Sequence, residues 1–100
     1  PVPERSGLAP FLHPARPNPF NPVTVIGYEL PAPAPVDLRI YDLTGKLVKT
    51  LAAGEQATAG HHEVVWNGRS DRGRTVAAGV YVCRLEAAGR SDTITLALIK

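Results

Sequence analysis

The chain has 100 residues, 20% of them charged, and a formal net charge of +2. This length suits one domain and is too short for an enzyme with a separate lid or cofactor domain. The basic residues, 11 Lys and Arg against 9 Asp and Glu, are dispersed along the sequence, which argues against nucleic acid as a partner.

The first 22 residues divide into two parts. Residues 1–16 form an extended arm that is more apolar than disordered tails usually are. Residues 17–22, with the sequence PNPFNP, form a proline-rich junction, because proline lacks an amide hydrogen and fixes its φ angle. We expect the arm to be either the first strand of its own sandwich or a strand donated to the edge of a neighbouring copy.

Residues 23–100 show the two-residue alternation of strands, broken by turn residues at intervals of about 8 to 12 positions. This rhythm predicts an all-β antiparallel sandwich of about seven strands. Strands are expected at 23–30, 36–42 and 46–51, with a hairpin turn at Asp42–Gly45 and a polar loop at 54–60.

The second half of the body repeats the pattern. A strand ending at Trp66 precedes a turn-rich loop at 67–79, and a hairpin turning at Ala88–Arg90 leads into a last strand at 93–100. Trp66 is the best candidate for the large central core residue. The predicted core comprises Ile26, Tyr28, Leu38, Ile40, Val64, Trp66, Tyr81, Leu85, Leu96 and Leu98.

Apolar residues outside that core predict protein interfaces. The last strand is apolar on both faces, so either it is central or its outer face meets a partner. Buried apolar side chains of an arm would likewise need a groove to lie in. The predicted interface residues are Leu8, Phe11, Leu12 and Phe20, with Ala97 and Ile99 as a second patch.

Candidate metal ligands do not converge in this pattern. His61, His62 and Glu63 are adjacent, and neighbours in a strand point to opposite faces. Asn67 and Asp71 offer two oxygens, whereas Ca²⁺ takes roughly six to eight. A plain turn is the preferred interpretation of this loop, and whether it binds an ion stays open.

Catalytic groups are equally sparse. Cys83 is the only cysteine and falls on the predicted core face, which indicates a buried structural thiol and excludes an intrachain disulfide. Ser6 and Ser70 have no histidine near them in the sequence, and no glycine-rich phosphate loop follows a strand. We therefore predict no enzyme activity, no cofactor and no metal site. No apolar run approaches the ~20 residues that cross a bilayer.

Several motifs in order resemble a known group of domains. They are PNPFNP at 17–22, Tyr28–Pro31, Tyr41–Asp42 with Gly45, Gly60–His62 with Trp66–Gly68, and Gly79–Tyr81. The sequence resembles the C-terminal sorting domains of type IX secretion cargo and the immunoglobulin-like domain of the flagellar hook-capping protein. This resemblance covers about residues 8–100. It implies an immunoglobulin-like sandwich, exported to the bacterial surface, with no catalytic residues to carry over.

Three functional hypotheses follow. The first is a self-assembling surface filament, in which the arm of one copy complements the sandwich of the next copy. The alternatives are a type IX sorting or anchoring domain, with secretion machinery as partner, and a hook-cap-like assembly scaffold. The first residue is Pro1 rather than Met, so we expect a removed leader or a piece of a longer chain.

Overall fold

The computed structural model describes residues 10–100, and this part of the chain folds into seven strands without a helix. The strands are β1 (Phe11–Leu12), β2 (Thr24–Leu30), β3 (Ala34–Asp42), β4 (Leu47–Ala57), β5 (Gly60–Trp66), β6 (Gly79–Ala87) and β7 (Arg90–Leu98). The predicted all-β architecture of about seven strands is confirmed.

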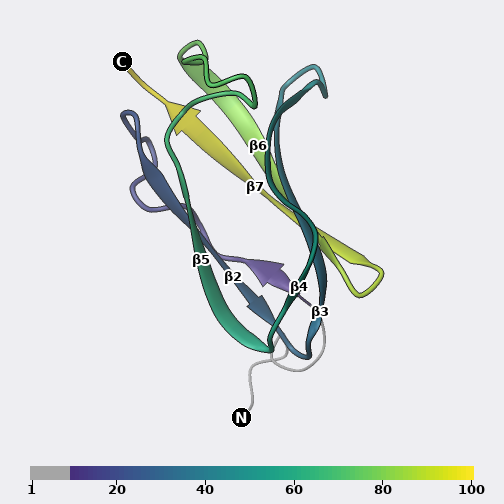
Figure 1. The fold of residues 1–100 in the computed structure, drawn as a ribbon. Coiled ribbons are helices and arrows are strands. Elements are labelled where there is room, and N and C mark those ends of the chain that lie inside the picture. Colours follow the sequence, from purple (N-terminus) through teal and green to yellow (C-terminus); the bar gives the residue numbers. More distant parts are fainter. Residues whose placement is uncertain (1–9) are drawn as a thin grey trace.

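The strands form two antiparallel sheets that face each other (Figure 1). The order is β1-β2-β5 in the three-stranded sheet and β4-β3-β6-β7 in the four-stranded sheet. The described part of the arm lies in the first sheet, where Phe11 pairs with Glu29 and Leu12 with Tyr28. The described residues of the arm therefore pack on their own sandwich in this structure.

Alternating side chains build the core between the sheets. In β3, Val36, Leu38 and Ile40 point inward and are at most 1% exposed, while Asp37 and Arg39 reach the surface. Each large apolar side chain buried in this way contributes roughly 1.5 to 3 kcal/mol. All the predicted core residues are buried except Val64, which is half-buried and packs against the core edge.

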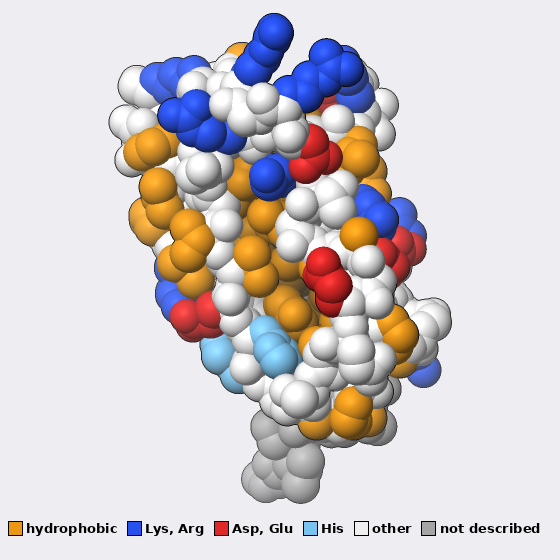
Figure 2. Space-filling view, viewed as in Figure 1, with side chains coloured by type: hydrophobic (Ala, Val, Ile, Leu, Met, Phe, Trp, Pro, Cys, Tyr) orange, Lys and Arg blue, Asp and Glu red, His pale blue; other side chains and the backbone are white. Residues whose placement is uncertain are grey.

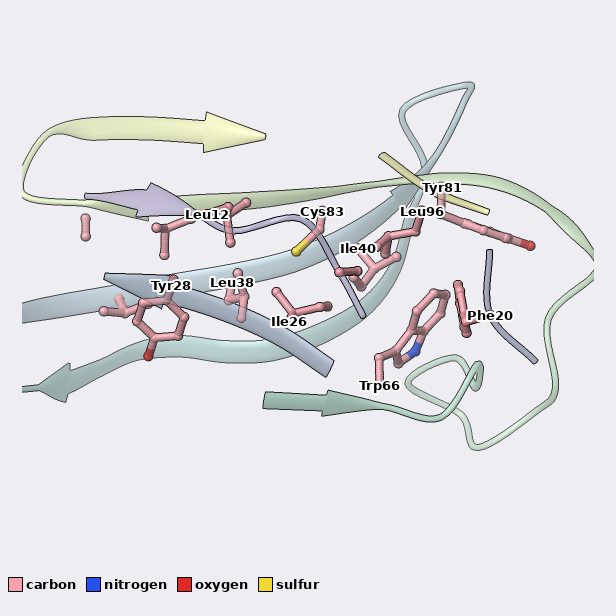
Figure 3. Close-up of a cluster of buried hydrophobic side chains, with 14 of the residues drawn as sticks. Leu12, Phe20, Ile26, Tyr28, Leu38, Ile40, Trp66, Tyr81, Cys83 and Leu96 are labelled. Carbon is pink, nitrogen blue, oxygen red and sulfur yellow. The ribbon is translucent and has the colours of Figure 1, made fainter. Parts of the chain in front are cut away.

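Aromatic side chains fill one end of this core (Figure 3). The ring centroid of Trp66 lies 5.5 Å from that of Phe20 and 5.6 Å from that of Tyr81. Their polar atoms are satisfied, since Trp66 Nε1 donates to the Arg69 carbonyl and the Tyr81 hydroxyl donates to the Ala77 carbonyl. The predicted central role of Trp66 is confirmed.

The sequence predicted the turn at Asp42–Gly45 more accurately than the length of β4. The turn at Asp42–Gly45 is confirmed: Asp42 Oδ1 accepts from the amides of Thr44 and Lys46, and Gly45 has a φ of 89°. The predicted loop at 54–60 is wrong over most of its length, because β4 continues to Ala57 and β5 begins at Gly60. Three register shifts between β3 and β4, with Gly54 at a φ of 74°, let the longer strand keep its pairing.

Candidate functional site

The junction closes one edge of the four-stranded sheet. The side-chain amide of Asn18 donates to the Thr95 carbonyl at 3.0 Å and accepts from the Ala97 amide at 2.9 Å. The backbone of Phe20 continues this ladder, donating to the Ala97 carbonyl and accepting from the Ile99 amide, both at 2.9 Å. Since β7 is an edge strand, these four hydrogen bonds take the place of a neighbouring strand.

The described arm and junction residues that were predicted as interface residues are buried or half-buried in this structure. Phe20 is 1% exposed and Leu12 is 6% exposed, both within the core, and Phe11 is half-buried on β1. Phe20 and Leu12 can contact a second copy only if the arm and junction exchange between molecules, whereas Phe11 keeps part of its surface exposed. Leu8, also predicted as an interface residue, lies outside the described residues.

The outer face of the four-stranded sheet carries an apolar patch at one end. The strand register places Val80 beside Ala97 and Leu47 beside Tyr41 on this face, Ile99 continues the alternation of β7, and Leu43 lies in the adjoining turn. We call the following residues the outer patch: Leu43, Leu47, Val80, Ala97 and Ile99. Leu43 is 69% and Ile99 52% exposed, and Ala97 is half-buried.

The other half of the same face is charged. Arg39 pairs with Asp37 at 3.2 Å, and Arg84 pairs with Glu86 at 3.1 Å. These ion pairs confine the outer patch to the other end of this face.

A different group occupies the outer face of the three-stranded sheet. His13, just after β1, Glu29 on β2 and His61 on β5 meet there, and one ligand atom from each lies within 4.8 Å of the others. Glu29 Oε2 is 2.9 Å from His13 Nε2 and 2.9 Å from His61 Nδ1. Histidine side chains reach the surface at the lower end of the molecule in Figure 2. We call these three residues the histidine cluster.

Two further residues hold the histidine cluster. Glu63 Oε2 lies 3.1 Å from His61 Nε2 and accepts a hydrogen bond from Arg16 at 3.1 Å. Hydrogen bonds from His13 and then His61 hold the pKa of Glu29 below its ordinary value, and hydrogen bonds to Glu63 and then Glu29 raise the pKa of His61. The cluster therefore favours charged carboxylates against a protonated His61.

Of the three residues in the cluster, the sequence singled out only His61. The prediction that His61 and its neighbours do not converge is wrong for Glu63, because residues two apart in a strand share a face and Glu63 contacts His61. His62 points away from His61, as predicted: its ring stacks on Tyr28 at 5.1 Å and its Nε2 contacts the Thr58 carbonyl. The convergence of His61 with His13 and Glu29 was missed, because it depends on pairing between strands distant in sequence. Gly27, inside β2, was the available signal, since glycine in a strand often marks a close approach.

The side chains of Asn67 and Asp71, in the loop at 67–79, accept hydrogen bonds from backbone amides of the protein. Asn67 Oδ1 accepts from the Arg69 amide, and Asp71 Oδ1 accepts from the Thr50 amide. The Asp71 amide also donates to the Val48 carbonyl, which fixes the loop to β4. Cys83 is fully buried, and burial raises the pKa of its thiol to about 12, which leaves it protonated and unreactive as a nucleophile.

Residues 20–91 match the FlgD Ig-like domain family, and the chain belongs to this family. The predicted immunoglobulin-like fold is thereby confirmed, and the fold is that of a structural or assembly module. No curated protein matches the chain. Residues 10–100 contain no helix long and apolar enough to cross a membrane.

Three solved structures resemble the chain. PorZ of Porphyromonas gingivalis, a surface component of the type IX secretion system, is 28% identical over 89% of this chain, with a TM-score of 0.60. PorU of the same organism is 19% identical over 91% with a TM-score of 0.68, and FlgD of P. aeruginosa is 22% identical over 73% with a TM-score of 0.60. The chain spans 11% of PorZ, 9% of PorU and 58% of FlgD.

Proposed function

We propose that this chain is a sorting or anchoring module of a protein at the bacterial cell surface, and that a component of a type IX secretion system binds it. The observation that carries this proposal is the likeness to PorZ, at 28% identity over 89% of the chain. The module acts by protein contact.

The degree of identity favours the type IX assignment over a hook-cap scaffold. The chain is 28% identical to PorZ and 22% identical to FlgD.

The outer patch is the surface that we assign to the secretion component. Apolar side chains exposed together at a sheet end cost solvation free energy unless a partner covers them. Leu43 and Leu47 are the most suitable residues for a test, because they are 69% and 44% exposed and contribute little to the core.

An export assay tests this proposal. The chain is fused downstream of a reporter protein in a bacterium with a type IX system, and the reporter is measured at the cell surface and in the medium. We expect the wild-type fusion to be exported and the double variant Leu43→Ser and Leu47→Ser to accumulate inside the cell. The matched control is Val65→Ser, which alters a 59% exposed apolar residue on the other sheet and leaves export unchanged. Retention of the wild-type fusion, in cells that export their own cargo, contradicts the proposal.

A second candidate is the self-assembling surface filament, in which the arm complements a neighbouring sandwich. What favours it is that the arm lies on β2 as an added edge strand, paired at Phe11 and Leu12 and again at Arg16, and that it enters the body through a proline-rich junction. A neighbour's β2 offers the same ladder to the arm, and head-to-tail exchange produces an open polymer.

Light scattering and negative-stain microscopy of concentrated protein test this second candidate. The filament hypothesis predicts polymers of the full chain and monomers of a chain lacking residues 1–16. Polymers that persist without these residues, or a full chain that stays monomeric at all concentrations, contradict it.

A further inference from the structure

We propose that the histidine cluster is a binding site for a zinc-class divalent metal ion, which fastens the arm to the three-stranded sheet. The ligand atoms are His13 Nε2, Glu29 Oε2 and His61 Nδ1, contributed by three different strands or their ends. Two imidazoles and one carboxylate form a donor set that zinc binds in many proteins.

The spacing of these atoms suits zinc. Bonds of about 2.0 to 2.1 Å in a tetrahedron place neighbouring ligand atoms roughly 3.3 Å apart. In the structure, Glu29 Oε2 lies 2.9 Å from each nitrogen, and all three atoms are within 4.8 Å of one another. An ion held by these three atoms in a tetrahedron would take its fourth ligand from solvent.

The surroundings of His61 support the same role. A metal-binding histidine usually donates its second ring nitrogen to a carboxylate, which fixes the ring and raises its basicity. Glu63 Oε2 lies 3.1 Å from His61 Nε2, and Arg16 donates a hydrogen bond to the same oxygen at 3.1 Å. His61 therefore has its ligand nitrogen aimed at Glu29 and its other nitrogen already supported.

A glycine makes room for the two imidazoles. A Cβ atom added at Gly27 would lie 3.1 Å from His61 Cε1 and 3.4 Å from His13 Cδ2. The two rings thus cover the position where any other residue of β2 would place its side chain. Their centroids are 5.4 Å apart, with the backbone amide of His13 donating to the Gly27 carbonyl at 2.8 Å. The convergence of the histidines is built into the backbone.

The consequence of metal binding is mechanical. His13 belongs to the arm, whereas Glu29 and His61 belong to the body, so the ion would add a link between them. This inference concerns the purified chain and does not depend on the proposed secretion role, because the two use opposite faces of the sandwich.

Titration calorimetry of the 100-residue chain with ZnCl₂, in a buffer that does not bind metal, tests the site. We expect one ion per chain, and a loss of affinity of at least about 100-fold in His13→Ala and in His61→Ala. Glu63→Gln removes no ligand and should weaken binding about 10- to 100-fold. His62→Ala is the matched control on the same strand and should bind as the wild type does.

Circular dichroism without metal establishes whether each variant is folded. If His13→Ala or His61→Ala does not fold, Glu63→Gln still tests the site, because it removes no ligand. Zinc should also raise the melting temperature of the wild type and of His62→Ala, and leave that of His13→Ala unchanged. The proposal is overturned if the wild type does not bind zinc, if the His13 and His61 variants bind it equally well, or if affinity depends on His62.

Discussion

The two edges of the four-stranded sheet are covered by the same device to different extents. The Asn18 side chain and the Phe20 backbone together pair with three alternate residues, which are Thr95 and Ala97 in β7 and Ile99 just beyond its end. On β4, Asp71 does this at one place, where its amide donates to the Val48 carbonyl and its Oδ1 accepts from the Thr50 amide. In each case, residues outside the sheet make the hydrogen bonds that a neighbouring strand would otherwise make.

The difference indicates where another strand could add to the sandwich. β7 is protected along its second half, whereas no strand of the described residues pairs with the outer edge of β4 beyond Thr50 or with that of β5. Both of these strands lie toward the viewer in Figure 1. The junction therefore belongs to the fold, and the open edges lie on the side away from the arm.

The largest expected effect is that of Phe20→Ala. Phe20 is 1% exposed and packs on Trp66, so the variant leaves a cavity at the point where the junction enters the core. We expect a loss of about 3 to 5 kcal/mol in the free energy of unfolding, measured by chemical denaturation. Phe11→Ala, at a half-buried position on β1, is the control and should lose less. Equal losses would mean that the junction does not anchor the edge.

Asn18→Ala comes next. It removes both hydrogen bonds that the side chain makes to β7, and a loss of about 1 to 2 kcal/mol is expected by chemical denaturation. The amide of Ala97 should also exchange faster with deuterium. Asn21→Ala, an exposed asparagine of the same junction, should change stability by less than about 0.5 kcal/mol. The comparison fails if the two asparagines behave alike.

Asp71→Ala should have a smaller effect, because one side-chain hydrogen bond to the β4 edge and one exposed ion pair with Lys49, at 3.9 Å, are lost. We expect about 0.5 to 1.5 kcal/mol, with Asp71→Asn retaining most of the stability since its Oδ1 still accepts from Thr50. Hydrogen exchange at the Thr50 amide provides the direct reading. Unchanged protection of Thr50 in Asp71→Ala would show that the loop does not cover β4.

The smallest effect concerns the thiol between the two edges. Cys83 lies on β6, is 0% exposed, and has a pKa raised to about 12 by burial. In native buffer, we expect Cys83 to react with a thiol reagent only as fast as the whole domain unfolds. Faster labelling than unfolding would reveal local opening at one of the edges.

The strands and turns were largely predictable from the sequence because their signals are local. Alternation identified the core positions of β3 and β6, and a glycine with positive φ marked the turn after Asp42. The length of β4 was not predictable, since its bulges depend on pairing with β3.

The candidate site was predictable only in fragments. The sequence suggested Phe20 as an interface residue, because a large aromatic side chain among prolines gives no sign of a core position. The structure places its ring beside Trp66 in the core. His13 and His61 are 48 positions apart in the numbering, and their meeting depends on the register of β1, β2 and β5. No pattern within the arm fixes that register.

The central claim is that the junction and arm complete their own sandwich. It is tested most directly by isotope-filtered NOE spectroscopy on an equal mixture of labelled and unlabelled protein, which separates contacts within one molecule from contacts between two. The account predicts that Leu12, which pairs with Tyr28 and is 6% exposed, shows NOEs to Tyr28 only within a single copy. NOEs between Leu12 of one copy and Tyr28 of another would contradict it and favour arm exchange.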